Sequence, residues 1–142
     1  MFDIKSEEFA KEFYKKLVIA KSRSYSPYSH YPVGACIYLK DGNFILGTNI
    51  ENASYGLANC AERSALFSTY SQGYKKEDIL CLGIIANCPK GKYASPCGAC
   101  RQVISELMDS KAPIFLYDQD GKYIVTNIDS LLPGMFTEGD LI

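Results

Sequence analysis

The sequence lacks an excess of either charge. Fifteen lysines and arginines stand against sixteen aspartates and glutamates among its 142 residues. Proteins that bind the phosphate backbone of nucleic acid usually carry a cationic surface, because neutralised phosphates supply much of the affinity. We therefore expect no nucleic-acid partner.

The sequence also has no apolar run of about 20 residues, the length needed to cross a bilayer. Its first residues, MFDIK, lack the charged-then-apolar order of a secretory signal. These absences predict a cytoplasmic protein with no membrane partner. In that compartment the six cysteines are expected to be reduced core residues, metal ligands or catalytic groups rather than a disulfide framework.

Repeats, low-complexity tracts and internal linkers are absent as well. With 47% apolar residues, 142 residues suffice for one well-buried domain and are too few for two ordinary ones. We therefore expect a single domain over residues 1–142.

Hydrophobic periodicity predicts alternating helices and strands. Helices are expected over residues 6–24, 60–70 and 97–108, with a last short helix closing at 131–134, and strands over 33–39, 44–48, 80–86, 114–117 and 123–126. The nearly unbroken apolar run at 80–86 is typical of a strand covered on both faces. This order predicts an α/β fold of three layers, α/β/α, with a five-stranded mixed sheet and helices on both faces.

Several side chains are expected to face the core. These are Phe9, Phe13, Leu17 and Ala20 in the first helix, Ala61, Ala65, Leu66 and Phe67 in the second, Val103, Ile104 and Leu107 in the third, and Tyr25 and Tyr28 as a core-lining aromatic pair. Cys36, Cys81 and Cys88 lie in or beside apolar strands and are expected to act as small apolar residues.

Two motifs place cysteines at predicted helix starts. Residues 59–63 read NCAER, and residues 95–102 read SPCGACRQ. The dipole and free N–H groups of a helix start favour the thiolate, the form of cysteine that binds zinc. Three thiolates, from Cys60, Cys97 and Cys100, would leave one position of a tetrahedral zinc ion open, as catalytic zinc sites do.

The Cys-x-x-Cys pair alone is ambiguous, because redox, metal and purely structural roles all use this spacing. Pairing it with a distant Cys-x-Glu favours a catalytic zinc site. Glu62 is near enough to move a proton of metal-bound water, whose pKa falls to about 7. Three thiolates give one Zn²⁺ a net charge of −1, and Arg63, Arg101 and the helix dipoles are the natural compensation.

These motifs resemble those of the small, homotetrameric cytidine deaminases, whose zinc signature has a three-cysteine form. The resemblance covers nearly the whole chain, from YSPYS at 25–29 through NIENA at 49–53 to LLPGMF at 131–136. It implies a cytidine deaminase-like fold and one Zn²⁺ per subunit on Cys60, Cys97 and Cys100.

The resemblance also implies the reaction. Zinc-bound hydroxide would attack C4 of cytidine or deoxycytidine with Glu62 as proton shuttle, and ammonia would leave to give uridine or deoxyuridine. The enzyme would then be a hydrolase that acts on the C–N bond of a cyclic amidine in pyrimidine salvage.

Substrate contacts follow from the same resemblance. Asn49 and Glu51 look like the pair that binds the ribose hydroxyls, and an amide and a carboxylate two residues apart on an extended segment suit two hydroxyls. The backbone of Ala61 would lie near the ring nitrogen that Glu62 reads. Tyr31 stands where the family more often has phenylalanine, and its ring would pack against the pyrimidine.

Three further residues complete the implied site. Arg63 is similar to the family residue that bonds the zinc thiolates. Tyr55 and Phe136 are similar to residues that neighbouring subunits contribute to each pocket. The resemblance thus implies a homotetramer with shared active sites that takes a small nucleoside substrate.

Other interpretations of these residues remain open at this point. His30 can be a loop residue or a fourth zinc ligand, Asn49 and Glu51 can cap loops, and Phe136 can serve packing alone. A blasticidin-type deaminase shares Cys-Ala-Glu and a similar second motif, but Arg63 favours the nucleoside enzyme. A non-catalytic zinc module would need a fourth protein ligand and would leave Glu62 without a role.

Overall fold

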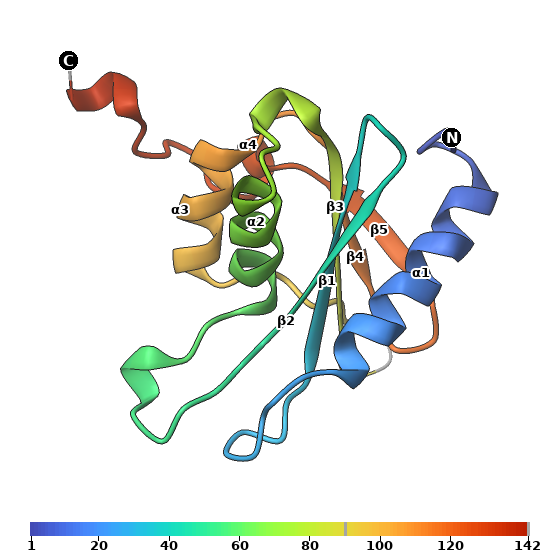
Figure 1. The fold of residues 1–142 in the computed structure, drawn as a ribbon, viewed down its shortest axis with the longest axis vertical. Helices are drawn as coiled ribbons and strands as arrows, with labels where there is room; N and C mark the ends of the chain where they lie inside the picture. Colours follow the sequence, from blue (N-terminus) through green and yellow to red (C-terminus); the bar gives the residue numbers. More distant parts are fainter. Residues whose placement is uncertain (90, 142) are drawn as a thin grey trace.

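The computed structural model describes residues 1–89 and 91–141 and builds them around one five-stranded mixed sheet (Figure 1). The strands are β1 (Val33–Leu39), β2 (Phe44–Thr48), β3 (Ile79–Ala86), β4 (Ile114–Tyr117) and β5 (Tyr123–Thr126), in the order β2-β1-β3-β4-β5. β3 and β4 are parallel, and the other neighbouring pairs are antiparallel. Because β1 is antiparallel to both β2 and β3, those two strands finish at the same end of the sheet.

Helices cover both faces of this sheet (Figure 1). Helix α1 (Glu7–Ser22) lies on one face, while α2 (Ala61–Ser71) and α3 (Gly98–Leu107) lie on the other, with α4 (Ile128–Leu131) beside α3. The predicted three-layer arrangement is confirmed. The short 3₁₀ turns η1 (Tyr55–Leu57), η2 (Lys76–Asp78) and η3 (Glu138–Leu141) were not predicted, because a single turn has no hydrophobic period. Among the described residues, no helix has both the length and the apolar character that crossing a membrane requires.

Helix α1 begins as its sequence predicts. The Oγ of Ser6 accepts a hydrogen bond of 3.1 Å from the N–H of Phe9, which satisfies a free donor of the first turn. Glu7 and Glu8 place negative charge at the positive end of the helix dipole. Its buried face consists of Phe9, Ala10, Phe13, Leu17 and Ala20, so the expected core positions are confirmed.

The core lies in two parts, one on each face of the sheet. Along β1, Cys36 and Tyr38 face α1. The alternate residues Ala35, Ile37 and Leu39 face the other side, where α2 and α3 lie. β3 is likewise buried on both faces, as its apolar run predicts. Cys81 joins Cys36 in the α1 part, where burial raises the pKa of both thiols, and the prediction of small apolar residues is confirmed for this pair.

The prediction for Phe67 is wrong, since its side chain is 47% exposed. α2 turns Phe67 away from the sheet into a groove beside Val103 and Leu107, which are themselves only partly buried. Ile104 alone of the three predicted α3 positions is fully buried. An apolar stripe wider than the buried face of a helix leaves its margin exposed.

The prediction for Tyr25 and Tyr28 is also wrong. Both side chains are exposed, because the loop that carries them runs beyond the end of the sheet, where no helix layer covers it. His30, in the same loop, is exposed with a φ of 55°, which confirms a loop position.

Two glycines let the helices contact the sheet closely. A Cβ on Gly47 of β2 would lie 2.4 Å from the backbone N of Ala65 and 2.5 Å from the O of Ala61. A Cβ on Gly34 of β1 would lie 2.6 Å from the O of Leu17 on the opposite face. Backbone atoms cannot swing aside as a flexible side chain can, so each position admits only hydrogen.

We predict that Gly34→Ala and Gly47→Ala each lower the free energy of unfolding by about 1–3 kcal/mol, the usual cost of overpacking. Gly56→Ala is the matched control, because a Cβ there meets nothing within 4 Å. Urea unfolding followed by circular dichroism measures all three. Equal stability of Gly47→Ala and Gly56→Ala would contradict the close contact.

Candidate metal centre and active site

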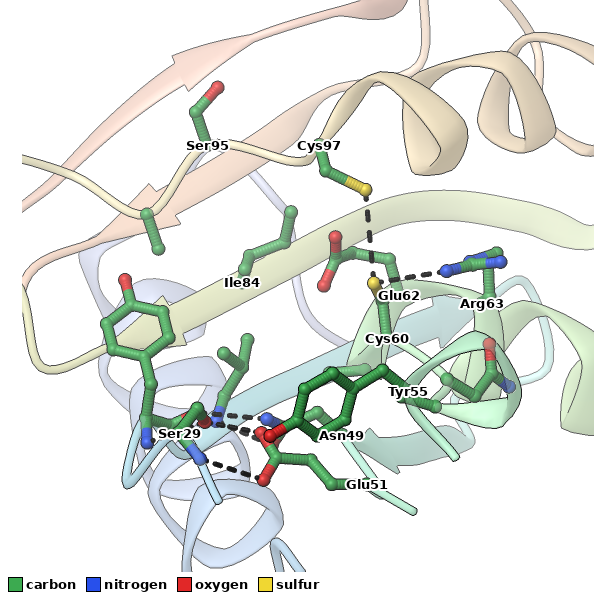
Figure 2. Close-up of a pocket in the computed structure, with 16 residues that line it drawn as sticks. Ser29, Asn49, Glu51, Tyr55, Cys60, Glu62, Arg63, Ile84, Ser95 and Cys97 are labelled. Carbon is green, nitrogen blue, oxygen red and sulfur yellow. Dashed lines mark hydrogen bonds between the residues drawn. The ribbon is translucent and has the colours of Figure 1, made fainter. Parts of the chain in front are cut away.

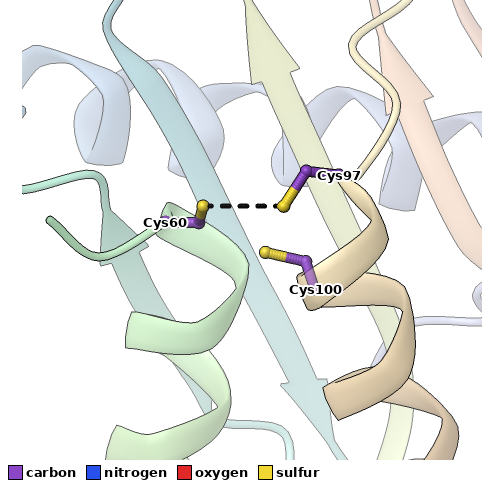
Figure 3. A group of neighbouring side chains, drawn as sticks. All are labelled: Cys60, Cys97 and Cys100. Carbon is purple, nitrogen blue, oxygen red and sulfur yellow. Dashed lines mark hydrogen bonds between the residues drawn. The ribbon is translucent and has the colours of Figure 1, made fainter. Parts of the chain in front are cut away.

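The loops that follow β2 and β3 bring cysteines to two adjacent helix starts (Figure 3). Cys60 is the N-cap residue of α2, and Cys97 is the N-cap residue of α3. Cys100 lies in the first turn of α3 and is buried. Both helices thus direct the positive ends of their dipoles toward the thiols, which favours thiolate.

The three thiols have the spacing of a zinc site. Their Sγ atoms all lie within 4.8 Å of one another, and those of Cys60 and Cys97 are 3.9 Å apart. Zn–S bonds of about 2.3 Å at tetrahedral angles place two sulfurs about 3.8 Å apart. Among the described residues this is the one group of three or more potential metal ligands, and His30 is outside it.

Hydrogen bonds stabilise negative charge on Cys60. Bonds from Cys100 and from Arg63 lower the pKa of the Cys60 thiol to about 5, and the Nη2 of Arg63 lies 3.2 Å from its Sγ. The same contact raises the pKa of Arg63. Arg63 Nε is buried without a partner in the described part of the chain. The positive guanidinium contacts the thiols directly. This suits a metal centre in which three thiolates, with a charge of −3, would bind an ion of charge +2.

Glu62 lies in the first turn of α2 with only 5% of its surface exposed. Burial raises the pKa of its carboxyl group, chiefly by desolvation. Figure 2 shows this carboxyl group beside the sulfurs of Cys60 and Cys97. A carboxyl group with a raised pKa holds its proton more readily than an exposed one, which suits a group that both takes and returns a proton.

A cavity of about 450 Å³ opens beside this centre (Figure 2). Its lining includes most of the residues that the sequence predicted for the site: Tyr31, Asn49, Glu51, Tyr55, Cys60, Ala61, Glu62, Arg63 and Cys97. Cys100 is buried and is not among the lining residues. Phe136 is 56% exposed and does not line the cavity of its own chain. The volume is within the usual range for small-molecule sites.

Asn49 and Glu51 are held in place at the end of the cavity away from the thiols (Figure 2). The Nδ2 of Asn49 donates to the O of Tyr31 at 2.9 Å, and its Oδ1 accepts from the N–H of Val33 at 2.9 Å. The carboxylate of Glu51 accepts hydrogen bonds from the N–H groups of residues 28 and 29 and from the Ser29 hydroxyl. The Ser29 hydroxyl is the main cause that lowers the pKa of Glu51. The proposed loop-capping role therefore exists, and it also fixes the orientation of both side chains.

Sequence reasoning missed several lining residues, among them Ser29, Ile84 and Ser95. It also missed a contact of 3.4 Å between the Tyr31 hydroxyl and the Cys88 Sγ. Burial, followed by this contact, raises the pKa of Tyr31 to about 12, so the phenol stays protonated. Cys88 is therefore buried as expected, but it also meets a polar partner at the cavity wall.

Arg101 does not contact the thiols as the charge argument suggested. Its Nε, Nη1 and Nη2 donate to the O of Pro96, the O of Leu131 and the Oγ of Ser95. Direct compensation is therefore observed for Arg63 and not for Arg101. The next residue, Gln102, donates from Nε2 to the O of Phe136 at 2.8 Å.

Comparison with known proteins identifies the family. Residues 7–116 match the family described as the cytidine and deoxycytidylate deaminase zinc-binding region. The chain is 43% identical to the cytidine deaminase of Halalkalibacterium halodurans over 127 residues, which cover 89% of this chain and 93% of that one. It is 42% identical to the cytidine deaminase of Sporosarcina psychrophila over 122 residues, covering 86% and 87% of the two chains.

A solved structure supports the same family. The crystal structure of cytidine deaminase from Burkholderia pseudomallei superposes with a TM-score of 0.84 at 38% identity, covering 89% of this chain and 98% of that one. Sequence and fold agree over most of the chain. The protein therefore belongs to the cytidine and deoxycytidylate deaminase family.

Proposed function

We propose that this enzyme deaminates cytidine and deoxycytidine hydrolytically, giving uridine or deoxyuridine and ammonia, in pyrimidine salvage. The observation that carries the proposal is the buried carboxyl group of Glu62 beside three clustered thiols, at the inner end of a cavity. The opposite end presents a fixed amide and a fixed carboxylate. A cytoplasmic location remains a prediction of the sequence alone.

The metal that these residues fit is zinc, one ion per subunit, held by Cys60, Cys97 and Cys100. Thiolates are soft ligands typical of zinc, and the 3.9 Å between two of the sulfurs suits its tetrahedron. When bound, the ion would supply a water molecule acidified to a pKa of about 7. Three protein ligands leave a coordination position free, which gives no support to a purely structural zinc module.

Glu62 would carry the protons of the reaction. Its carboxylate takes a proton from the attacking water and delivers it to the ring nitrogen next to C4, and a second transfer lets the amino group leave as ammonia. The raised pKa of this buried carboxyl group suits both directions of transfer. Ala61 would present its backbone to the pyrimidine, and Tyr31 would pack its ring against it.

The sugar end of the cavity favours a nucleoside over a nucleotide. Glu51 and Asn49 would bind the ribose hydroxyls through the groups that their loop contacts leave accessible. Arg63 is the only cationic side chain among the described residues that line the cavity, and it is bonded to Cys60. A phosphate group would therefore meet the negative charge of Glu51 without a cation to balance it.

We also infer a homotetramer with shared active sites. Tyr55 lines the cavity and yet is 75% exposed in the single chain. Phe136 is exposed and lies outside its own cavity, which suits a side chain that reaches the cavity of a neighbouring subunit. Large exposed aromatic side chains are typical of interfaces.

We predict that Glu62→Gln lowers kcat for cytidine by about 10²–10⁴-fold, the usual contribution of a general acid–base, and leaves bound zinc unchanged. The fall in ultraviolet absorbance as cytidine becomes uridine measures turnover. Glu77→Gln, in the short turn η2, is the control and should retain full activity. Normal turnover in Glu62→Gln would refute the proton-shuttle role, and no turnover in the zinc-loaded wild type would refute the proposed reaction.

We predict that Cys97→Ala loses bound zinc, because two thiolates cannot replace three in holding the ion. Cys36→Ala is the matched control, since Cys36 is buried in the α1 part of the core, away from the cluster. Zinc content after gel filtration, measured by mass spectrometry, compares the two. Equal zinc in both variants would mean that Cys97 is not a ligand.

We predict that cytidine 5′-monophosphate has a kcat/KM at least about tenfold below that of cytidine, because the phosphate would face the negative charge of Glu51 and like charges brought together disfavour binding. Glu51→Gln should narrow this gap by weakening cytidine binding and removing the repulsion. Initial rates with both compounds on both proteins provide the comparison. A wild type that uses the two substrates equally well would refute the nucleoside preference.

A further inference from the structure

Arg101 joins the start of α3 to two segments beside the metal centre. Its Nε donates to the O of Pro96 at 2.8 Å and its Nη2 to the Oγ of Ser95 at 2.8 Å. Its Nη1 donates to the O of Leu131, at the end of α4, at 2.7 Å. The N–H groups of a guanidinium lie in one plane and point in fixed directions, so one arginine can reach these three acceptors at once. The single ammonium group of lysine cannot do so.

The segment that Arg101 holds is packed at Ala94 and Pro96, which are both buried, but few hydrogen bonds hold it. Residues 93–96 belong to no helix or strand, and within the described part of the chain the two bonds from Arg101 are the only hydrogen bonds they make. The next residue, Cys97, has its side chain exposed. Burial therefore does not fix the position of this thiol, although Cys100, one turn later, is buried.

We propose that Arg101 is a positioning residue, whose hydrogen bonds to Ser95 and Pro96 keep the Cys97 thiol at ligand distance from Cys60 and Cys100. It acts through the directions of its N–H groups and not through its charge. Without it, residues 95–97 gain conformational freedom that metal binding must remove again. The inference rests on the zinc site proposed above and is independent of the substrate.

The test compares a charge-retaining variant with a charge-removing one. Zinc-loaded Arg101→Lys and Arg101→Ala are mixed with a chromogenic zinc chelator, and the rate of zinc transfer is followed by absorbance. Both should release zinc at least about tenfold faster than the wild type, because each lost hydrogen bond is worth about fivefold. In cobalt-substituted protein, both should also weaken the thiolate-to-cobalt absorption, a readout that loss of stability alone would leave unchanged.

Tyr70→Phe is the matched control. The Tyr70 hydroxyl donates to the O of Leu107 at 2.7 Å, so the variant removes one side-chain bond from the other end of α3. It should release zinc within about twofold of the wild-type rate, because one bond at that end does not hold residues 95–97. Ser95→Ala removes one bond of Arg101 without altering the arginine and should release zinc about two- to fivefold faster.

Several outcomes would overturn the proposal. If Arg101→Lys released zinc at the wild-type rate and Arg101→Ala released it faster, the positive charge of residue 101, and not its hydrogen bonds, would retain the zinc. Should both arginine variants fail to fold, Ser95→Ala decides, and wild-type release there would refute the positioning role. A wild-type protein that holds no zinc would refute the proposed zinc site itself. A wild type that holds zinc, with variants that release it at the wild-type rate, would refute only the positioning role of Arg101.

Discussion

Repulsion among Cys60, Cys97 and Cys100, once all three are ionised to bind a metal, is the constraint on which the rest of the site depends. At the 3.9 Å that separates the sulfurs of Cys60 and Cys97, two unit charges repel by about 4 kcal/mol at an effective dielectric constant of 20. The chain as a whole has a net charge of −1 and provides no general positive field. Compensation must therefore be local. Two helix N-termini and the guanidinium of Arg63, 3.2 Å from Cys60, supply it where the thiols lie.

The sheet topology makes this local arrangement possible. β2 and β3 run in the same direction on either side of β1, so the loops after them leave the sheet at one end and the helices after those loops start side by side. Ligands in open α/β sheets commonly bind at such strand ends. Gly47 then lets the first turn of α2 contact β2 without a side chain between them. The position of Cys60 is thus set by the backbone of its helix, whereas that of Cys97 depends more on side-chain hydrogen bonds.

The sequence predicted the regular elements, the fold class and the cysteine group, but not which side chains stay exposed or which distant side chains meet. Hydrophobic periods placed the regular helices and strands within about two residues, and the fold class is confirmed. The cysteine spacing indicated the three thiols that the structure brings together. The period could not show that Phe67 stays exposed, because an apolar stripe does not reveal which part of it is covered. Nor could it find the contact of Tyr31 with Cys88, 57 positions away, because only the folded chain brings them together.

The same limit explains why two interpretations of Asn49 and Glu51 seemed to compete. From sequence alone, loop capping and ribose binding were alternatives. In the folded chain both side chains bond to the loop that carries Ser29 and Tyr31, and both line the cavity. A ligand at their remaining polar atoms would meet groups already held in one orientation, which lowers the entropy lost on binding. The hydrogen bonds that hold the loop would therefore also orient both residues for the sugar binding proposed above.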